Sequence, residues 1–299
     1  MESNSTNVTT IKDSDFLWTQ ISELPYFRGL LRAVEAKFYQ DLTLKRPVLD
    51  VGCGDGHFAA RTFAQKIDVG IDPWKGPLAE ATARGVYDQT LESAGAEIPF
   101  PDETFETVIS NSVLEHIPDL DPVITEISRV IKPGGLFVFC VPNHQFLGNL
   151  SVSNFLDRIH LKPLGNLYRA FFNRISRHYH CDALDVWKKR LTDNGFELVR
   201  YWHYFSPEAF HVLEWGHYFG LPSLITRKLF GKWILFPNRT ALAPIEKLCR
   251  KYYEEPWEQE TGSYTFYIAR KKVQIANAAI IESARRLNLF NFFLATEFT

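Results

Sequence analysis

The sequence is poor in cysteine and contains no long apolar run. Each of these features argues against certain classes of protein. Its 299 residues include four cysteines, which lie far apart and form no C-x-x-C pair. This usage argues against a disulfide framework and a zinc site and fits a reducing compartment, so a cytoplasmic location is expected. No stretch reaches about 18 uncharged apolar residues, so no transmembrane helix is expected. The polar N-terminus lacks the basic-then-apolar order of a signal peptide.

A surplus of charge is also missing. The chain has 33 Lys and Arg against 35 Asp and Glu, which gives a net charge of -2 and a pI of about 6.5. Without a global basic field, no nucleic-acid partner is expected. Apolar residues are abundant instead, with 45% hydrophobic and 14% aromatic side chains. That is ample for one large domain with an inserted cap, or for two small domains.

The chain is organised around the stretch Val48–Gly56, which reads V-L-D-V-G-C-G-D-G. A short apolar run ends in an acid, and alternating glycines lead into a helical pattern, so a buried strand turns sharply into a helix. The glycines allow positive φ angles and let a ligand lie against the main chain. The start of the helix presents free N–H groups. The stretch therefore predicts a binding site for a nucleotide-like cofactor.

The glycine spacing separates two classes of cofactor. A dinucleotide fingerprint reads G-x-G-x-x-G/A, whereas this loop reads G-x-G-x-G and has His57 where the third glycine would fall. Asp50, at the end of the strand, suits a cationic ligand better than a pyrophosphate. A second acid, Asp72, lies about twenty residues past Gly52, the offset at which a carboxylate reaches a ribose hydroxyl. That offset fits NAD and S-adenosylmethionine equally well.

The glycine loop resembles motif I of the class I S-adenosylmethionine-dependent methyltransferases. Two further runs, IPFPDETFETVISNSVLEHI at 98–117 and RVIKPGGLFVF at 129–139, resemble the methyltransferase type 11 group. The matching motifs span about residues 47–143. The resemblance implies an enzyme with S-adenosyl-L-methionine as its cofactor. It also implies an α/β fold, a seven-stranded, mostly parallel, Rossmann-like sheet with helices on both faces and a helical cap.

The resemblance also implies a set of cofactor-binding residues. Asp50 would face the methionine amine, Gly52 and Gly54 would lie under the ligand, and Asp72 would bind the ribose hydroxyls. Family members commonly carry an aspartate that binds the adenine amino group, and this chain has Ala94 at that place. Adenine recognition is then expected from the backbone of Ser93 and Ala94, or from Glu92. The full predicted set is Asp50, Gly52, Cys53, Gly54, Asp72, Pro73, Ser93, Ala94, Asn111 and Leu114.

The catalytic residues are harder to predict, because methyl transfer from a sulfonium is an in-line displacement that needs no metal ion and no covalent intermediate. A base is needed only when the accepting atom still carries a proton. Four histidines fall near the predicted cleft, and the weak preference is for His178 or His180 over His144 and His116. The alternative for each is a hydrogen-bonded structural histidine. For Glu115, a hydrogen bond to its loop and a solvated position are equally plausible.

No metal site is expected. His178, His180 and Cys181 lie close together in the sequence, but no fourth ligand accompanies them at a usable spacing.

The predicted boundaries divide the chain into a core and several excursions. Helix starts are expected from Asp121 and Asp182 acting as N-caps, and a strand from 136 to 141. Residues 1–12 are expected to be disordered, and a helix is expected over 57–65 and over 273–287. The predicted segments are an N-terminal tail with lid helices (1–45), the cofactor-binding core (46–145), a helical insert (146–180), a core helix and strand (181–205), an aromatic-rich cap insert (206–261), a closing strand (262–270) and a C-terminal tail (271–299).

The composition of the two inserts, 146–180 and 206–261, indicates the kind of acceptor. Residues 210–236 are rich in Trp, Tyr, Phe and Leu with Lys and Arg interleaved, and the helix at 164–177 has the same character. Aromatics beside basic residues suit a surface whose apolar side enters the headgroup boundary of a membrane. The alternatives are packing on the sheet and a homodimer interface. The predicted acceptor is a small apolar, lipid-like or natural-product molecule, with peripheral membrane contact.

Two other functions stay open at this stage. One is a non-catalytic protein of the same fold that binds the cofactor or a partner. The other is a nicotinamide-dependent oxidoreductase, which His57 disfavours. The sequence leaves open which atom, O, C or N, accepts the methyl group.

Overall fold

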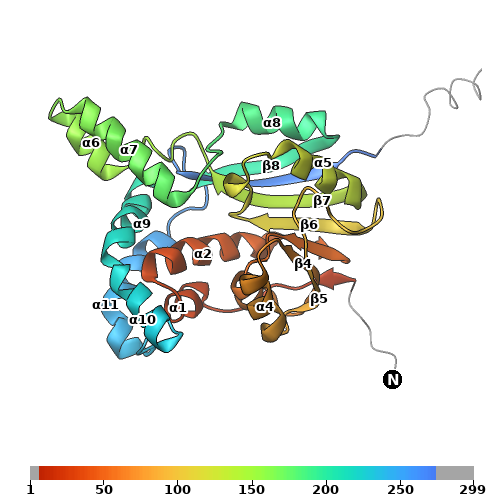
Figure 1. Cartoon of the computed structure of the whole chain (residues 1–299), viewed down its shortest axis with the longest axis horizontal. Helices are drawn as coiled ribbons and strands as arrows, with labels where there is room; N and C mark the ends of the chain where they lie inside the picture. The colour runs from red at the N-terminus through yellow and green to blue at the C-terminus, as the bar shows by residue number, and fades with distance from the viewer. Residues whose placement is uncertain (1–6, 274–299) are drawn as a thin grey trace, which may run out of the picture.

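A computed structural model describes residues 7–273, and a seven-stranded sheet organises it (Figure 1). The strand order is β5-β4-β3-β6-β7-β9-β8, and β9 runs antiparallel to both of its neighbours while the remaining pairs are parallel. This confirms the predicted fold class. The strands are β3 (Val48–Val51), β4 (Ile67–Asp72), β5 (Tyr87–Glu92), β6 (Phe105–Asn111), β7 (Ile131–Pro142), β8 (Phe196–Tyr204) and β9 (Tyr264–Lys271).

Helices cover both faces because the central strands are buried on both sides, as expected for a parallel sheet. On one face α5 (Asp121–Val130) and α8 (Leu184–Asp193) pack on the sheet, with Trp187 fully buried among Phe139 and Tyr267. The opposite face holds α1 (Phe16–Ile21), α2 (Tyr26–Phe38), α3 (His57–Thr62) and α4 (Lys75–Arg84). Short 3-10 turns follow α2 and β6, at η1 (Tyr39–Asp41) and η2 (Leu114–His116).

A helical cap lies beside the sheet, on the left in Figure 1. Two of its helices, α9 and α11, pack against α2 and tie the cap to the rest of the molecule. Among residues 7–273, no helix combines the length and the apolar character needed to cross a bilayer. The cap helices are α6 (Ser151–Arg158), α7 (Lys162–Ser176), α9 (Pro207–Phe219), α10 (Leu221–Phe230) and α11 (Arg239–Tyr253).

The expectation of disorder through residue 12 is wrong for its second half. Strand β1 (Val8–Thr9) pairs with β2 (Leu44–Lys45), and Ile11 bridges Phe63. The same contact explains why the first core helix ends at Thr62 rather than at residue 65, since Phe63 has an extended backbone that pairs outside the helix. A segment without a strong local pattern is ordered here by strand pairing.

Both predicted aspartate N-caps are wrong, for one shared reason. Helix α5 begins at Asp121 itself, and α8 has Ala183 in the capping position. The carboxylates of Asp121 and Asp182 instead accept hydrogen bonds from Arg190, each at 3.0 Å. The guanidinium donor carries a full positive charge whereas the backbone N–H donor of an N-cap carries none, so both carboxylates pair with Arg190.

The strand predicted from 136 to 141 is longer than expected. Strand β7 begins at Ile131, directly after α5, and its first residue pairs with Phe105 across a register shift. Ile131 is fully buried, which favours its place in the sheet over a loop. The helix predicted over 273–287 lies outside the described residues.

Candidate active site

The glycine loop lies at the carboxyl end of β3, where two glycines have geometry that other residues tolerate poorly. Gly52 has a φ of +78°, and an added Cβ would fall 2.3 Å from a methyl carbon of Val113. Gly54 has a φ of +55°, and an added Cβ would meet no atom within 4 Å. The loop is therefore packed on the protein side at Gly52 and open at Gly54, as a backbone that receives a ligand requires.

Asp72 is held at the end of β4 next to this loop. Its carboxylate accepts a hydrogen bond from the Gly54 N–H at 3.0 Å and another from the Trp74 N–H at 2.8 Å. The side chain is buried, yet each oxygen keeps a lone pair for a further donor. Asp72 can thus organise the loop and still accept from a ligand hydroxyl.

Asp50 is buried in the middle of the same site. The Tyr87 hydroxyl donates to its carboxylate at 2.7 Å, a contact that the sequence analysis missed. Burial, together with the nearby charge of Asp72, raises the pKa of Asp50 to about 7, although the Tyr87 hydrogen bond opposes this change. A cation placed next to Asp50 would reverse the burial effect and favour the charged carboxylate.

The remaining predicted cofactor residues lie around this centre. Cys53 and Leu114 are buried, whereas Pro73 and Ala94 are exposed. The Ser93 hydroxyl donates to the Glu97 carbonyl at 2.6 Å, which orders the turn after β5. Their roles in cofactor binding stay predictions.

A buried glutamate joins α2 to this site. Glu35 is fully buried, and its carboxylate accepts four hydrogen bonds. The donors are Arg32 at 2.7 Å, Asn111 at 2.6 Å, Ser112 at 2.8 Å and Tyr204 at 2.9 Å. Ser112 also has a left-handed backbone with a φ of 51°, which is uncommon outside glycine and asparagine. The polar end of β6 is thus fixed by the helix that covers it.

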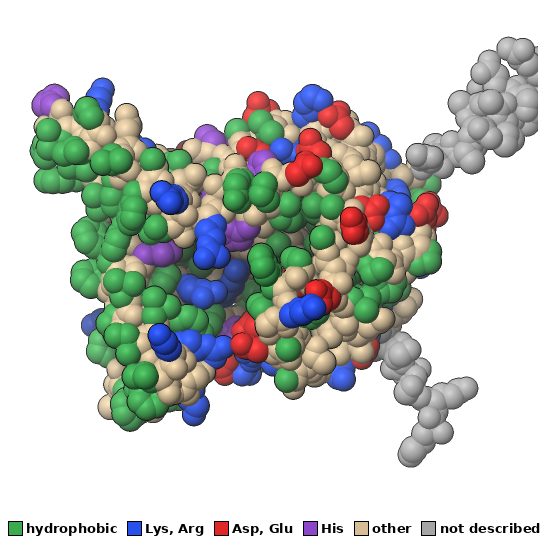
Figure 2. Space-filling model, viewed as in Figure 1, with side chains coloured by type: hydrophobic (Ala, Val, Ile, Leu, Met, Phe, Trp, Pro, Cys, Tyr) green, Lys and Arg blue, Asp and Glu red, His purple; other side chains and the backbone are tan. Residues whose placement is uncertain are grey.

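A cavity of about 720 Å³ begins at Ser112 and extends between α2 and the cap helices α7, α9 and α10. Figure 2 shows the molecule hollowed here, with basic and histidine side chains near the opening. Because Val113, the residue after Ser112, contacts Gly52, the inner end of the cavity is adjacent to the glycine loop. The apolar part of its wall comprises Pro25, Phe27, Leu31, Phe146, Phe171, Ile175, Leu213, Leu221, Leu224 and Trp233.

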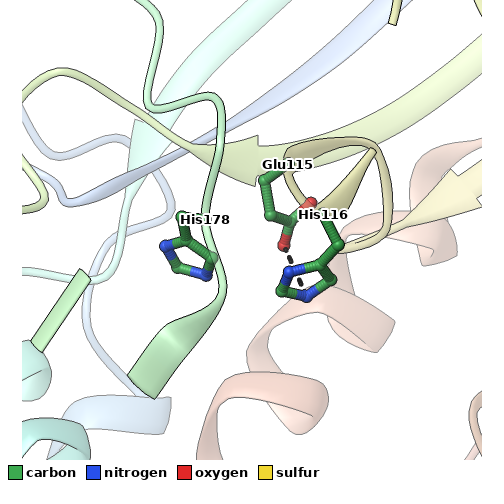
Figure 3. Close-up of side chains that lie close together, drawn as sticks. All are labelled: Glu115, His116 and His178. Carbon is green, nitrogen blue, oxygen red and sulfur yellow. Dashed lines mark ion pairs between the residues drawn. The ribbon is translucent and has the colours of Figure 1, made fainter. Parts of the chain in front are cut away.

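Three titratable side chains meet on the wall of this cavity (Figure 3). Glu115 and His116 come from η2, after β6, and His178 comes from the segment after α7. One ligand atom from each lies within 4.8 Å of the others. The Glu115 Oε1 and His116 Nε2 atoms are 3.8 Å apart, and the second carboxylate oxygen of Glu115 has no hydrogen-bond partner among the described residues.

Burial shifts all three of these groups toward their neutral forms. It raises the pKa of Glu115 to about 8, with Glu35 adding to the effect and Arg32 opposing it. It lowers the pKa of His178 to about 3, and it also lowers the pKa of His116. At neutral pH the cluster therefore holds a proton on Glu115 beside two neutral imidazoles, an arrangement that can give or take a proton.

The cluster also has the composition of a divalent-metal site, because two imidazoles and one carboxylate are a ligand set that zinc enzymes use. The solvated position considered for Glu115 is wrong, since the side chain is buried.

The other two candidate histidines lie away from the cavity. His144 is exposed and faces His203, with a ring separation of 6.3 Å. The His180 ring lies 3.2 Å from the carbonyl oxygen of Pro118 and 3.5 Å from the Asp182 carboxylate. The weak preference for His180 over His116 therefore finds no support in the placement of the two side chains.

Comparison with known proteins agrees with this geometry. A family model described as a methyltransferase domain matches residues 49–139. An uncharacterized methyltransferase from Mycobacterium sp. (strain KMS) is 36% identical over 133 residues, which are 42% of this chain and 53% of that protein. A ubiquinone/menaquinone biosynthesis C-methyltransferase from Pasteurella multocida is 30% identical over 183 residues, 52% of this chain and 64% of that protein. The chain thus spans about half to two thirds of the length of these curated relatives.

Among solved structures, an S-adenosylmethionine-dependent methyltransferase from Thermotoga maritima aligns with a TM-score of 0.51. The alignment covers 83% of this chain and 91% of that protein at 15% identity, so it speaks for the fold alone. The family match is consistent with the order of the strands and with the glycine loop and its two acids. Residues 49–139 thus match a methyltransferase domain, and the chain is similar to S-adenosylmethionine-dependent methyltransferases in the sequence of this region and in its fold.

Proposed function

We propose that this protein transfers the methyl group of S-adenosylmethionine to a small, largely apolar acceptor, lipid-like or a natural product, held in the 720 Å³ cavity. The observation that supports this most directly is the position of the cavity. Its inner end adjoins the glycine loop through Val113, and its wall is mostly aliphatic and aromatic. Binding pockets for small molecules commonly combine such walls with a few convergent polar groups.

The residues around the loop fit the cofactor. The open space above Gly54 admits a ligand against the backbone, Asp72 has free lone pairs for ribose hydroxyls, and Asp50 supplies a carboxylate for a cationic group. When bound, the cofactor supplies an activated methyl group on a sulfonium with a good leaving group. The protein's part is to hold the accepting atom close to that methyl and in line.

Glu115 is the best candidate for a base if the accepting atom carries a proton. It lines the cavity, its free oxygen has no partner among the described residues, and its pKa of about 8 is close to working pH. His178 stays neutral at physiological pH and is suited to orient the acceptor by a hydrogen bond. A base of this kind acts when deprotonated, so the rate is expected to rise as the pH rises through about 8.

Release of S-adenosylhomocysteine, measured across a panel of apolar phenols, quinols, amines and alcohols, tests the activity. Turnover with at least one apolar acceptor supports the proposal. Tight binding of S-adenosylmethionine without turnover of any acceptor would favour the alternative, a binding protein without catalysis. The family match disfavours a nicotinamide-dependent oxidoreductase, and the absence of fluorescence enhancement on addition of NADH would agree.

Single-turnover rates of glutamine variants test the base. Glu115→Gln is expected to lower the rate by roughly 10²–10⁴-fold, and His178→Gln by a smaller factor. His144→Gln and His180→Gln are matched controls, because neither side chain lines the cavity. Losses below about tenfold at Glu115, His116 and His178 would leave positioning as the whole mechanism. Treatment with a chelator is expected to leave the rate unchanged, whereas a loss restored by a divalent ion would favour the metal role.

A further inference from the structure

The cap exposes an unusual concentration of large apolar side chains. Of the 23 that are exposed in the described part of the chain, sixteen lie in residues 155–175 and 215–236, which we call the cap face. Figure 2 shows hydrophobic side chains gathered along the side of the molecule that α6, α7, α9 and α10 occupy. Seven of them are 60–70% exposed: Phe155, Leu167, Phe219, Ile225, Leu229, Phe230 and Phe236. Apolar surface this concentrated is typical of interaction sites.

The two segments form one face. The hydroxyl oxygens of Tyr168 on α7 and Tyr218 on α9 lie 2.8 Å apart, and Tyr168 also donates to Glu214 at 2.9 Å. Both segments also line the same cavity, α7 through Phe171 and α10 through Leu224. The apolar surface is therefore continuous with the wall of the acceptor site.

The cap face is also strongly basic. Its two segments contain seven Lys and Arg and one acid, Asp157, for a net charge of +6 in a chain whose net charge is -2. Asp157 pairs with Arg169, and Arg227 pairs with Glu80. The other five basic residues of the face have no carboxylate within 4 Å in the region that the structure covers: Arg158, Lys162, Arg174, Lys228 and Lys232.

We propose that the cap face docks this protein on an anionic lipid bilayer, with the exposed side chains of α7 and α10 in the headgroup boundary. Such a surface offers both an apolar boundary and negative charge, which match the two properties of the face. A second copy of this chain is disfavoured, because two faces of charge +6 repel each other. Docking leaves the cavity facing the membrane, so an apolar acceptor passes into it without crossing water. That last step rests on the proposed function, whereas docking itself does not.

Vesicle flotation of the full chain, without methyl donor or acceptor, tests the docking. Phosphatidylcholine vesicles are compared with vesicles that also contain phosphatidylglycerol, at low and at high salt. The wild type is expected to float with the anionic vesicles, more strongly at low salt. Lys228→Gln with Lys232→Gln is expected to weaken this binding about 30-fold.

Leu229→Glu with Phe230→Glu is expected to abolish flotation, since charged side chains replace the apolar contact. Neither residue lines the cavity, so binding of S-adenosylmethionine is expected to be unchanged. Val199→Glu, on an exposed position of β8, is the matched control and should float like the wild type. Circular dichroism of each variant checks the fold.

The proposal is overturned if the wild type stays unbound with anionic vesicles at low salt, or if the double glutamate variant floats like the wild type. A wild-type dimer in light scattering that the variant loses, without vesicle binding, would assign the face to a second copy instead. An acidic protein partner would be indicated if binding to a polyanion column, but not to vesicles, depends on the lysines. Because flotation requires no turnover, its failure is distinguishable from failure of the methyl-transfer proposal.

Discussion

The cofactor region and the cap differ in which kinds of side chain they bury and which they expose. Around the glycine loop, carboxylates are buried and bonded: Asp50 to Tyr87, Asp72 to two backbone N–H groups and Glu35 to four donors. In the cap, apolar side chains are exposed and most of the basic ones lack a carboxylate partner among the described residues. The cap face carries +6, so the rest of the chain carries -8.

The difference indicates where each region makes its contacts. Buried polar groups are costly unless they are paired, so the cofactor region is closed by bonds within the protein and keeps its shape without a partner. Apolar side chains that stay exposed contribute no free energy of burial to folding. The cap therefore leaves apolar surface available for an interaction outside the chain. The following predictions test this contrast, beginning with the largest effect.

Loss of the buried carboxylate that joins α2 to the ends of β6 and β8 is expected to have the largest effect on stability. Glu35→Ala leaves Arg32, Asn111, Ser112 and Tyr204 without their shared acceptor, which is expected to cost about 3–5 kcal/mol of unfolding free energy. Urea unfolding measures this. Glu208→Ala, at an exposed position, is the control and should cost less than about 1 kcal/mol. Equal effects at both positions would contradict the role of the network.

A pair of variants on one helix tests whether the cap has a core as well as an exposed face. Phe172 of α7 is fully buried, and Leu167 of the same helix is 66% exposed. Phe172→Ala is expected to cost about 3–5 kcal/mol, because it removes buried contacts and leaves a cavity. Leu167→Ala is expected to change stability by about 0.5 kcal/mol or less. If Leu167→Ala proves as costly as Phe172→Ala, the exposed face is covered in solution.

The ribose assignment of Asp72 predicts a loss of cofactor affinity. Asp72→Ala removes a charged hydrogen-bond acceptor and is expected to weaken S-adenosylmethionine binding by about 1.5–3 kcal/mol. Calorimetry of the variant measures the effect. Asp88→Ala, at an exposed position of β5, serves as the control. Unchanged affinity in Asp72→Ala would rule the assignment out.

The raised pKa of Asp50 predicts that cofactor affinity depends on pH. At a pH below its pKa of about 7, Asp50 is neutral and attracts a cation weakly. At a pH above this pKa, its carboxylate is charged. A bound cation lowers this pKa, so binding releases a proton and affinity falls as the pH falls below 7, by up to about tenfold for each pH unit. Asp50→Asn is expected to remove this dependence. A wild type with equal affinity at pH 6 and pH 8 would contradict the placement of Asp50 beside a cationic group.

The local sequence was sufficient for the sheet and for the cofactor side of the site. The spacing of Gly52, Gly54 and Asp72 is encoded within a few residues of each strand end, and parallel strands bring their carboxyl ends to one edge. This is why the glycine loop and a mostly parallel sheet could be predicted, although the order of the strands was not. The errors fell where neighbours in space compete with neighbours in sequence, as when Arg190 takes Asp121 and Asp182 from their expected caps.

Glu35 and Glu115 had only weak signals in the sequence. Arg32 and Glu35 have the i, i+3 spacing of an ion pair on a mostly apolar helix, which hints at a buried pair but does not identify its partners. Glu115 stands beside His116, but whether it is buried depends on the segment after α7, whose Tyr179 N–H donates to the Glu115 carbonyl at 2.8 Å.

The sequence by itself determined the glycine loop and its two acids, because glycine spacing and strand ends are local properties, and the resemblance of its motifs to a known family implied the fold class. Tertiary structure alone decided that Glu35 joins Asn111 and Tyr204, 76 and 169 positions away along the chain. It also decided that Phe172 is buried and Leu167 is not, although both are apolar residues of one helix. The physical reason is that burial depends on which surfaces meet, and that is set by packing between elements distant in the chain.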